Sequence, residues 1–364
     1  PLYILENKLT YKADTRLPLE VLEKSPFVYT GPNLGSFLVG AIQGAINHHG
    51  RILPRFYPLT VSEVTSNNKI IDKIFSLCFF YVNDNDELVL FLTHPCWLNR
   101  SDSAPLINFL ITKADELAKY GGCKFIEMEF HEVASYVAFP TSLSNFSYDL
   151  RKISVENNDL SLLQSHGFQE ESKIHCYEQS INEIEKRAQE DHTTSSQFQI
   201  KSLTPSEFNL LNAKIDNYPA KAYTLSHSDP YFAFFNPLSK DIVSAAYKRT
   251  RWFSKGELVG YFRWTPNLFE PSLEYKLPVP LLFNYVFENY SFTHGKIIDW
   301  GLRGDDINLY TSLLLHASHS MKENGLKILQ IGNVTDNQSR MKSFLMQYDF
   351  RKVHTIKLLQ KRVN

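Results

Sequence analysis

The sequence is poor in cysteine, and its four cysteines form no closely spaced pair. Cys78, Cys96, Cys123 and Cys176 are scattered along 364 residues. A structural zinc site usually needs cysteines a few residues apart, and a disulfide framework needs a denser supply of them. His316 and His319 lie three positions apart, but no third ligand accompanies them. We therefore expect buried free thiols in a reducing compartment, and no metal site.

Long apolar runs and an excess of one charge are also missing. No stretch approaches the roughly 18 consecutive apolar residues that a membrane-spanning helix needs. The first residues lack the basic segment and apolar core of a secretory signal. The net charge is −1, so no global field attracts nucleic acid or an anionic membrane. These absences predict a cytoplasmic protein that binds neither.

The chain has enough length and apolar content for two domains. Its 364 residues are 43% hydrophobic, and a single domain commonly has about 100–200 residues. A charged stretch that gives way to Thr, Ser and Gln has the composition of a linker at 183–199. We therefore expect an N-terminal domain over 1–182 and a C-terminal domain over 200–364.

The first expected domain shows hydrophobic patterns that alternate between strand and helix periods. They predict, in order, a hairpin within 76–97 turning at Asn-Asp-Asn-Asp, a helix over 106–122 stopped by Gly-Gly, a strand over 123–130, a short helix over 158–167 and a strand over 168–179.

One face of the expected 106–122 helix is marked by apolar residues at helical spacing. They are Leu106, Phe109, Leu110, Leu117 and Tyr120. Because such residues line up on one side of a helix, we expect them to face the core.

The second expected domain repeats this order. Its patterns predict a hairpin within 245–266 turning at Lys255-Gly256, a strand over 296–302, a loop over 303–306, a helix over 307–325, a strand over 326–334, a helix over 336–349 and a strand over 350–362. Phe168 and Phe350 stand just before the last strand of each copy, 350 − 168 = 182 residues apart. The expected fold class is α/β with a mixed sheet, written twice.

This order resembles that of the GNAT superfamily of N-acetyltransferases. The segments ELAKYGGCKFIEMEF and LLQSHGF are similar to that superfamily's central helix, fifth strand and fourth helix. GLKILQIGNVTDNQSRMKSFLMQYDF resembles the same region, including Met341 nine residues before Phe350. The resemblance covers roughly residues 70–180 and 240–364. It implies two tandem GNAT-like acyl-CoA N-acyltransferase domains.

The resemblance also implies a diphosphate-binding loop after the fourth strand of each domain. In the superfamily this loop reads Arg/Gln-x-x-Gly-x-Gly/Ala, because backbone N–H groups at a helix N-terminus must close on the pyrophosphate of acetyl-CoA. The matching positions are Arg100, Ser101, Asp102, Ser103 and Ala104 in the first domain, and Leu302, Arg303, Gly304, Asp305, Asp306, Ile307 and Asn308 in the second.

Both loops depart from the superfamily pattern while keeping its Arg. In the first loop Ser103 stands where the pattern has Gly, and Pro105 stands where it has Gly or Ala. In the second loop Asp306 and Asn308 stand at the same two positions. An Asp at a helix start can cap the N–H groups with its own carboxylate, which would repel a diphosphate. An ordinary capped helix start is therefore the alternative interpretation of each loop.

Catalytic groups are also inferred by resemblance. The superfamily often places a Tyr acid five residues before the Gly-Phe phenylalanine, where this chain has Leu163 and Leu345. Glu127 and Glu129 share one face of an expected strand and are candidate bases, although solvent exposure would also explain them. Asp299 lies inside the apolar strand KIIDWGL, where a carboxylate needs a partner or a function.

The resemblance therefore implies an acyl-CoA-dependent N-acyltransferase. Acetyl-CoA would be the co-substrate, and an amine of a small molecule or peptide would attack the thioester directly. Two alternatives stay open at this point: a catalytically degenerate GNAT-fold protein that binds a ligand or partner, and a transferase that uses aminoacyl-tRNA, which the near-neutral charge disfavours.

Overall fold

The computed structural model describes a little over half of the chain. The described residues are 10–14, 57–66, 70–83, 85–92, 96–97, 104–131, 133–134, 153–154, 158–190, 197–204, 207–208, 218–222, 242–248, 256–266 and 291–364.

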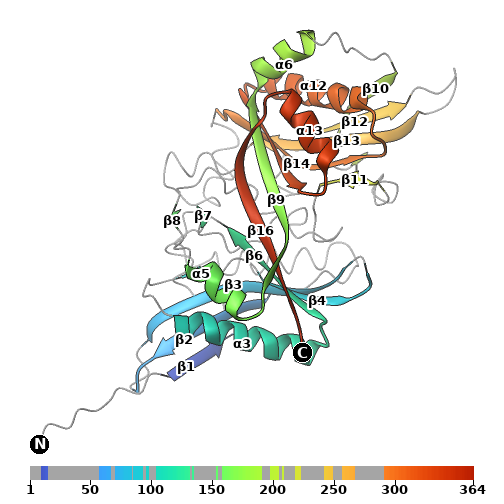
Figure 1. The fold of residues 1–364 in the computed structure, drawn as a ribbon. Helices are drawn as coiled ribbons and strands as arrows, with labels where there is room; N and C mark the ends of the chain where they lie inside the picture. The colour runs from blue at the N-terminus through green and yellow to red at the C-terminus, as the bar shows by residue number, and fades with distance from the viewer. Residues whose placement is uncertain are drawn as a thin grey trace, which may run out of the picture.

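The elements of the first half follow the expected order (Figure 1). They are β1 (Thr10–Asp14), β2 (Tyr57–Val64), β3 (Ile70–Val82), β4 (Leu88–Leu92), β5 (Cys96–Trp97), α3 (Ala104–Gly121), β6 (Phe125–His131), β7 (Val133–Ala134), β8 (Ile153–Ser154), α5 (Asn158–Ser165) and β9 (Gln169–Ser180). Strands β3 and β4 form the expected hairpin, in which the Asn83 carboxamide accepts from the Glu87 N–H at 2.9 Å.

The second half repeats that order. Its elements are α6 (Ile181–Glu190), β10 (Phe198–Leu203), β11 (Ala220–Lys221), β12 (Ile242–Lys248), β13 (Glu257–Pro266), β14 (His294–Leu302), α12 (Ile307–Glu323), β15 (Ile328–Thr335), α13 (Ser339–Gln347) and β16 (Arg351–Arg362). The expected hairpin is the antiparallel pair β12–β13, and Lys255 of its turn lies outside the described residues.

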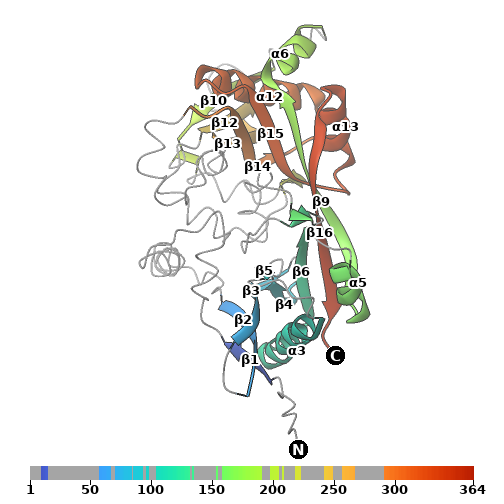
Figure 2. The ribbon, with the colours of Figure 1, turned by 90° about the vertical axis from the view of Figure 1, so that its left-hand side faces the viewer.

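Strands β9 and β16 are exchanged between the two halves. Across the main sheet the first half has the order β4-β6-β16-β9, and the second has β14-β15-β9-β16. Each half therefore uses the last strand of the other half to continue its own sheet. Figures 1 and 2 show the two long strands running side by side between the group with α3 and α5 and the group with α12 and α13.

Each half has its own hydrophobic core on the helix-covered face of its sheet. One core joins α3 and α5 to Leu90, Ile126 and Met128, and the other joins α12 and α13 to Ile297 and Trp300. Ile181, Ile184 and Ala188 place α6 in the second core, although this helix begins at the end of the first half. The charged stretch expected to begin a linker is thus helical and packed up to Glu190.

The prediction of which α3 residues are buried is partly wrong. The buried residues are Leu106, Ile107, Leu110, Ile111, Ala114 and Ala118. Tyr120 is instead 94% exposed. The two alanines lie on the buried side because small residues let the helix pack closely on the sheet, and the large ring is displaced to the opposite side.

Left-handed residues end the helices that precede β6, β9, β15 and β16. Gly122, Gly167 and Gly325 have φ of 71°, 87° and 82°, and Asp349 takes the same conformation at 54°. A helix C-terminus favours this conformation, which glycine adopts without strain. Asp349 therefore stands where the first half has Gly167.

Three cysteines are free and buried as expected: Cys78, Cys123 and Cys176. Burial raises the pKa of the Cys78 thiol to about 12 and the pKa of the Cys123 thiol to about 11. No helix within the described ranges combines the length and apolar character needed to cross a membrane.

Candidate functional site: two parallel strand pairs

The parallel strands β14 and β15 diverge before they end. They pair from His294 with Ile328 to Ile297 with Ile331. Beyond that point β15 pairs with β9, whereas β14 pairs with β13 on one edge and with the short strand β11, at Gly301 and Leu302, on the other. The divergence begins beside a β-bulge, because Ile297 pairs with Trp264 and Asp299 with Arg263, which leaves Ile298 as an extra residue. Bulges often terminate pairing next to functional sites. In this half β11 therefore lies along the β14 edge that faces β15, where an extended ligand would otherwise bind.

Trp300 spans the opening between β14 and β15. Its indole N–H donates to the carbonyl of Gly332 on β15 at 3.1 Å, and its side chain is fully buried. The Trp300 carbonyl also accepts from the Ala222 N–H at 2.8 Å, so both a side chain and the chain at the end of β11 bond to these strands where β14 and β15 separate.

The loop after β14 contains the sequence-predicted diphosphate residues of the second half. Leu302 is the buried end of β14, the next four residues are exposed, and Ile307 and Asn308 open α12. Asp306 caps the helix, since its carboxylate accepts from the Asn308 N–H at 2.9 Å. The cap stabilises α12 through hydrogen bonding and through the helix dipole, and it puts a negative charge where an anionic ligand would bind.

Other residues tie the same loop to its surroundings. The Arg303 guanidinium forms an exposed ion pair with Glu257, and Arg340 of α13 donates to the Asp305 carbonyl at 2.8 Å. Arg303 is therefore directed to a neighbouring carboxylate, and Arg340 supplies a further cation beside the loop.

The corresponding loop of the first half is described only at its end. Arg100, Ser101, Asp102 and Ser103 lie outside the described residues, and Ala104 is the exposed first residue of α3. Strand β4 pairs in parallel with β6 from Val89 with Phe125 to Leu92 with Met128. Strand β6 continues to His131, where its described partner is β16.

Glu127 and Glu129 of β6 are both buried, at 5% and 0% exposure, so the solvent-facing interpretation is wrong. Glu127 accepts from the Tyr81 hydroxyl and, at 3.0 Å, from the Gln360 carboxamide. Burial raises the pKa of the Glu127 carboxyl above its ordinary value, and these two hydrogen bonds oppose that rise. A carboxylate with a raised pKa is a stronger base near neutral pH.

Asp299 also has a tyrosine partner. The Tyr261 hydroxyl lies 3.2 Å and 3.1 Å from its two carboxylate oxygens, and Arg263 is directly opposite on β13. Burial, reinforced by the charge of Asp299, raises the pKa of Tyr261 well above its usual range. The buried carboxylate expected to need a partner thus has one.

The structure does not bring the three candidate carboxylates together. Glu127 and Glu129 belong to β6 and Asp299 to β14, with β16, β9 and β15 between those strands. Each half has its own tyrosine–carboxylate pair, Tyr81 with Glu127 and Tyr261 with Asp299. Sequence reasoning missed both tyrosines, because neither lies near its carboxylate in the chain.

The exchanged strands add a carboxamide–carboxylate pair to each half. Gln360 of β16 donates to Glu127 of β6, whereas Gln330 of β15 donates to Glu178 of β9 at 3.2 Å. The acid is on the half's own strand in the first case and on the exchanged strand in the second. No group of three or more metal-ligating side chains occurs among the described residues.

Comparison with known proteins gives structural matches only. No protein-family model and no curated protein sequence matches the chain. A tandem GNAT protein from the clavulanic acid biosynthesis pathway is 9% identical, with a TM-score of 0.54 over 98% of this chain and 99% of that one.

Two further structures match nearly the whole chain. A conserved Enterococcus faecalis V583 protein described as a probable N-acyltransferase is 7% identical, with a TM-score of 0.54 over 98% of this chain and 73% of that one. A GCN5-related N-acetyltransferase from Anabaena variabilis is 9% identical, with a TM-score of 0.51 over 98% of this chain and 73% of that one. Together with the repeated β4-α3-β6 and β14-α12-β15 units, these matches show that the chain has a tandem GNAT fold.

Proposed function

We propose that the protein is an acyl-CoA-dependent N-acyltransferase whose active half is the first. The observation that carries the proposal is Glu127, a buried carboxyl with a raised pKa on the strand that follows the α3 crossover. Acetyl-CoA is the proposed acyl donor, and the acceptor is an amine of a small molecule or peptide.

The proposed chemistry needs a base and a leaving thiolate. Glu127 accepts a proton from the acceptor ammonium, and the neutral amine then attacks the thioester carbonyl. The carbon–sulfur bond breaks, and CoA leaves as a thiolate that takes up a proton from water or an acid. Glu129 is a second candidate base on the same face of β6, and Asp299, on β14, is the candidate base of the second half.

The loop residues divide the two halves. In the second half Asp306 places a carboxylate on the first turn of α12, and Trp300 spans the strand opening, so the residues present do not fit a diphosphate and its extended arm. The first loop has Ser101, Ser103 and Ala104 at the positions nearest α3, and a single acid, Asp102. We therefore assign acetyl-CoA binding to the loop Arg100–Ala104. The loop Leu302–Asn308 should contribute little to it.

Isothermal titration calorimetry with acetyl-CoA tests the assignment. The wild-type protein should bind saturably, Arg100→Ala should weaken binding at least tenfold, and the matched Arg303→Ala should leave it within twofold. Absence of saturable binding at millimolar acetyl-CoA would sink the proposal. Loss of binding in Arg303→Ala alone would move the site to the second half.

A catalytically degenerate GNAT-fold protein is the second candidate function. The Asp306 cap and the Trp300–Gly332 hydrogen bond favour it, because both occupy positions that a co-substrate would need. For this candidate, screening by thermal shift should give stabilising ligands that lack a thioester, while acetyl-CoA produces no shift.

A further inference from the structure

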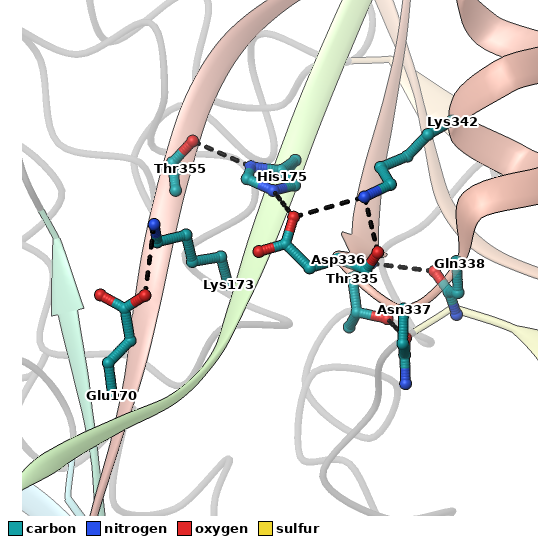
Figure 3. Close-up of polar contacts among 9 residues, drawn as sticks. All are labelled: Glu170, Lys173, His175, Thr335, Asp336, Asn337, Gln338, Lys342 and Thr355. Carbon is teal, nitrogen blue, oxygen red and sulfur yellow. Dashed lines mark hydrogen bonds and ion pairs between the residues drawn. The ribbon is translucent and has the colours of Figure 1, made fainter.

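A carboxylate, an imidazole and a hydroxyl are joined in one hydrogen-bonded row near the middle of the β9–β16 pair (Figure 3). The Nε2 of His175 lies 2.8 Å from an Asp336 carboxylate oxygen, and its Nδ1 lies 2.9 Å from the Thr355 hydroxyl. The three side chains come from the turn after β15, from β9 and from β16. The row therefore exists only because the two strands are exchanged.

Asp336 holds the imidazole in one orientation. Its partial burial acts to raise its carboxyl pKa, but the His175 hydrogen bond and the Lys342 ammonium outweigh burial and lower it below the ordinary value. Lys342 also donates to the Asp336 carbonyl at 2.6 Å, which fixes the turn. An ionised carboxylate only accepts, so Nε2 carries the hydrogen.

The hydroxyl is consequently directed at a basic nitrogen. In the neutral ring Nδ1 carries the remaining in-plane lone pair, so the Thr355 O–H donates to Nδ1. His175 is buried at 4% exposure, whereas Thr355 is half-buried and the Asp336 side chain is 51% exposed. The row thus runs from an exposed carboxylate through a buried base to a hydroxyl on a half-buried residue.

Irregular backbone surrounds the row on two of its strands. On β16, Lys352 pairs with Tyr177 and His354 with Cys176, so Val353 is an extra residue. On β15, two residues lie between the partners of Tyr177 and His175, and one of them, Asn333, is left-handed with φ of 58°. Bulges and strained dihedrals concentrate at functional sites, where they direct side chains away from regular positions.

We propose that Thr355 is an acyl-accepting nucleophile, activated by His175 and oriented through Asp336, with simple acyl esters and thioesters as substrates. A hydroxyl bonded to a base that is itself held by a carboxylate is the arrangement that nucleophilic acyl transfer requires. The site goes beyond the proposed N-acyltransferase and does not depend on acyl-CoA binding.

The proposed reaction balances without a further reagent. The Thr355 oxygen bonds to the substrate's carbonyl carbon, and its proton passes to Nδ1 of His175. The bond to the leaving oxygen or sulfur then breaks, and the leaving group departs as an anion or takes the proton from Nδ1. Asp336 stabilises the transient imidazolium, and water later hydrolyses the acyl-threonine ester.

The test uses p-nitrophenyl acetate, which needs no CoA site. The full-length protein should release nitrophenolate in a stoichiometric burst, and peptide mass mapping should place one acetyl group on Thr355. Thr355→Val should reduce the burst at least tenfold, Thr355→Ser should restore it, and Asp336→Asn should slow it. Thr112→Val, which removes an exposed α3 hydroxyl bonded to the Asn108 carbonyl, is the matched control and should change nothing.

Labelling of the wild-type protein decides the question even if a variant fails to fold. An acetyl group on lysine alone, or no acetyl group, overturns the proposal, as does an unchanged burst in a folded Thr355→Val protein. Calorimetry with acetyl-CoA on the same sample tests the proposed N-acyltransferase separately. The Thr355 proposal and the N-acyltransferase proposal can therefore fail independently.

Discussion

Trp300 donates its indole N–H to the Gly332 carbonyl 3.1 Å away, where β14 and β15 no longer pair. In the tandem GNAT fold this opening lies between the fourth and fifth strands of the second half. This side-chain bond and the pairing of β11 with Gly301 and Leu302 together close the second half where β14 and β15 no longer pair.

Trp300→Phe should destabilise the protein more than the same change at Trp264. Both indoles are buried in the same core, but the Trp264 N–H has no hydrogen-bond partner among the described residues. Removing the Trp300 bond leaves a buried carbonyl unsatisfied, which costs about 1–3 kcal/mol. Urea unfolding should show a lower midpoint for Trp300→Phe than for Trp264→Phe, and equal midpoints would contradict the role assigned to the bond.

Glu127→Gln should flatten the dependence of stability on pH. Because the folded-state pKa of Glu127 is raised, the folded protein holds more protons than the unfolded chain between the ordinary value of 4.5 and the folded value. The free energy of unfolding therefore falls as pH rises through that interval, and an uncharged carboxamide at this position should remove the fall. Urea unfolding at a series of pH values measures it.

Glu87→Gln is the control for that series. Hydrogen bonds from Lys124 and Asn83 lower the pKa of Glu87, so its contribution is present above the ordinary value and is lost on acidification. The two variants should change opposite sides of the stability profile. A Glu127→Gln profile that parallels the wild type would show that the carboxyl is not protonated more readily in the folded state.

Asp306 should act on α12 through its cap and on anions through its charge. Asp306→Ala removes the bond to the Asn308 N–H and should cost about 0.5–2 kcal/mol, whereas Asp306→Asn keeps an acceptor and should cost little. Asp306→Asn should also strengthen any acetyl-CoA binding by the second half in calorimetry. Asp305→Asn removes the neighbouring charge without touching the cap, and a drop in stability equal to that of Asp306→Ala would rule out the capping effect.

The two halves should require each other to fold. A fragment 1–190 lacks β16 beside β6, and a fragment 197–364 lacks β9 beside β15, so each would expose an unpaired strand edge. Each fragment alone should aggregate, and co-expression should give a soluble complex of the two by size-exclusion chromatography. A monomeric, cooperatively unfolding 1–190 fragment would contradict this expectation.

Element order was predictable because it depends on local patterns. Helical spacing and Gly stops located α3, alternation located β6, and an extended run and an apolar run located β9 and β14 within a few residues. The match of Phe168 with Phe350 also extends to the preceding residue, since Gly167 and Asp349 both have positive φ. Turns and helix caps depend on a few neighbouring residues, so they can be recognised in both halves even though residue identity between the halves is slight.

Long-range pairing was not predictable, because no local pattern encodes it. Gln360 lies opposite Glu127 only through the strand exchange, and Tyr81 reaches Glu127 from β3 across β4. His175 was part of an expected strand, but its partners Asp336 and Thr355 are 161 and 180 residues away. The roles proposed for Glu127, Glu129, Asp299 and the two loops stay predictions until ligand binding is measured.

The exchanged strands also determine how late in synthesis the protein can fold. Ile174 of β9 pairs with Ile356 of β16, 356 − 174 = 182 residues later in the chain. During synthesis β6 and β9 emerge long before the strand that separates them, so neither sheet can close until β16 has been made. Pairing over such a distance is slow, and the waiting edges are open to wrong partners. A chain with this topology should depend on chaperones that shield strand edges until synthesis reaches β16.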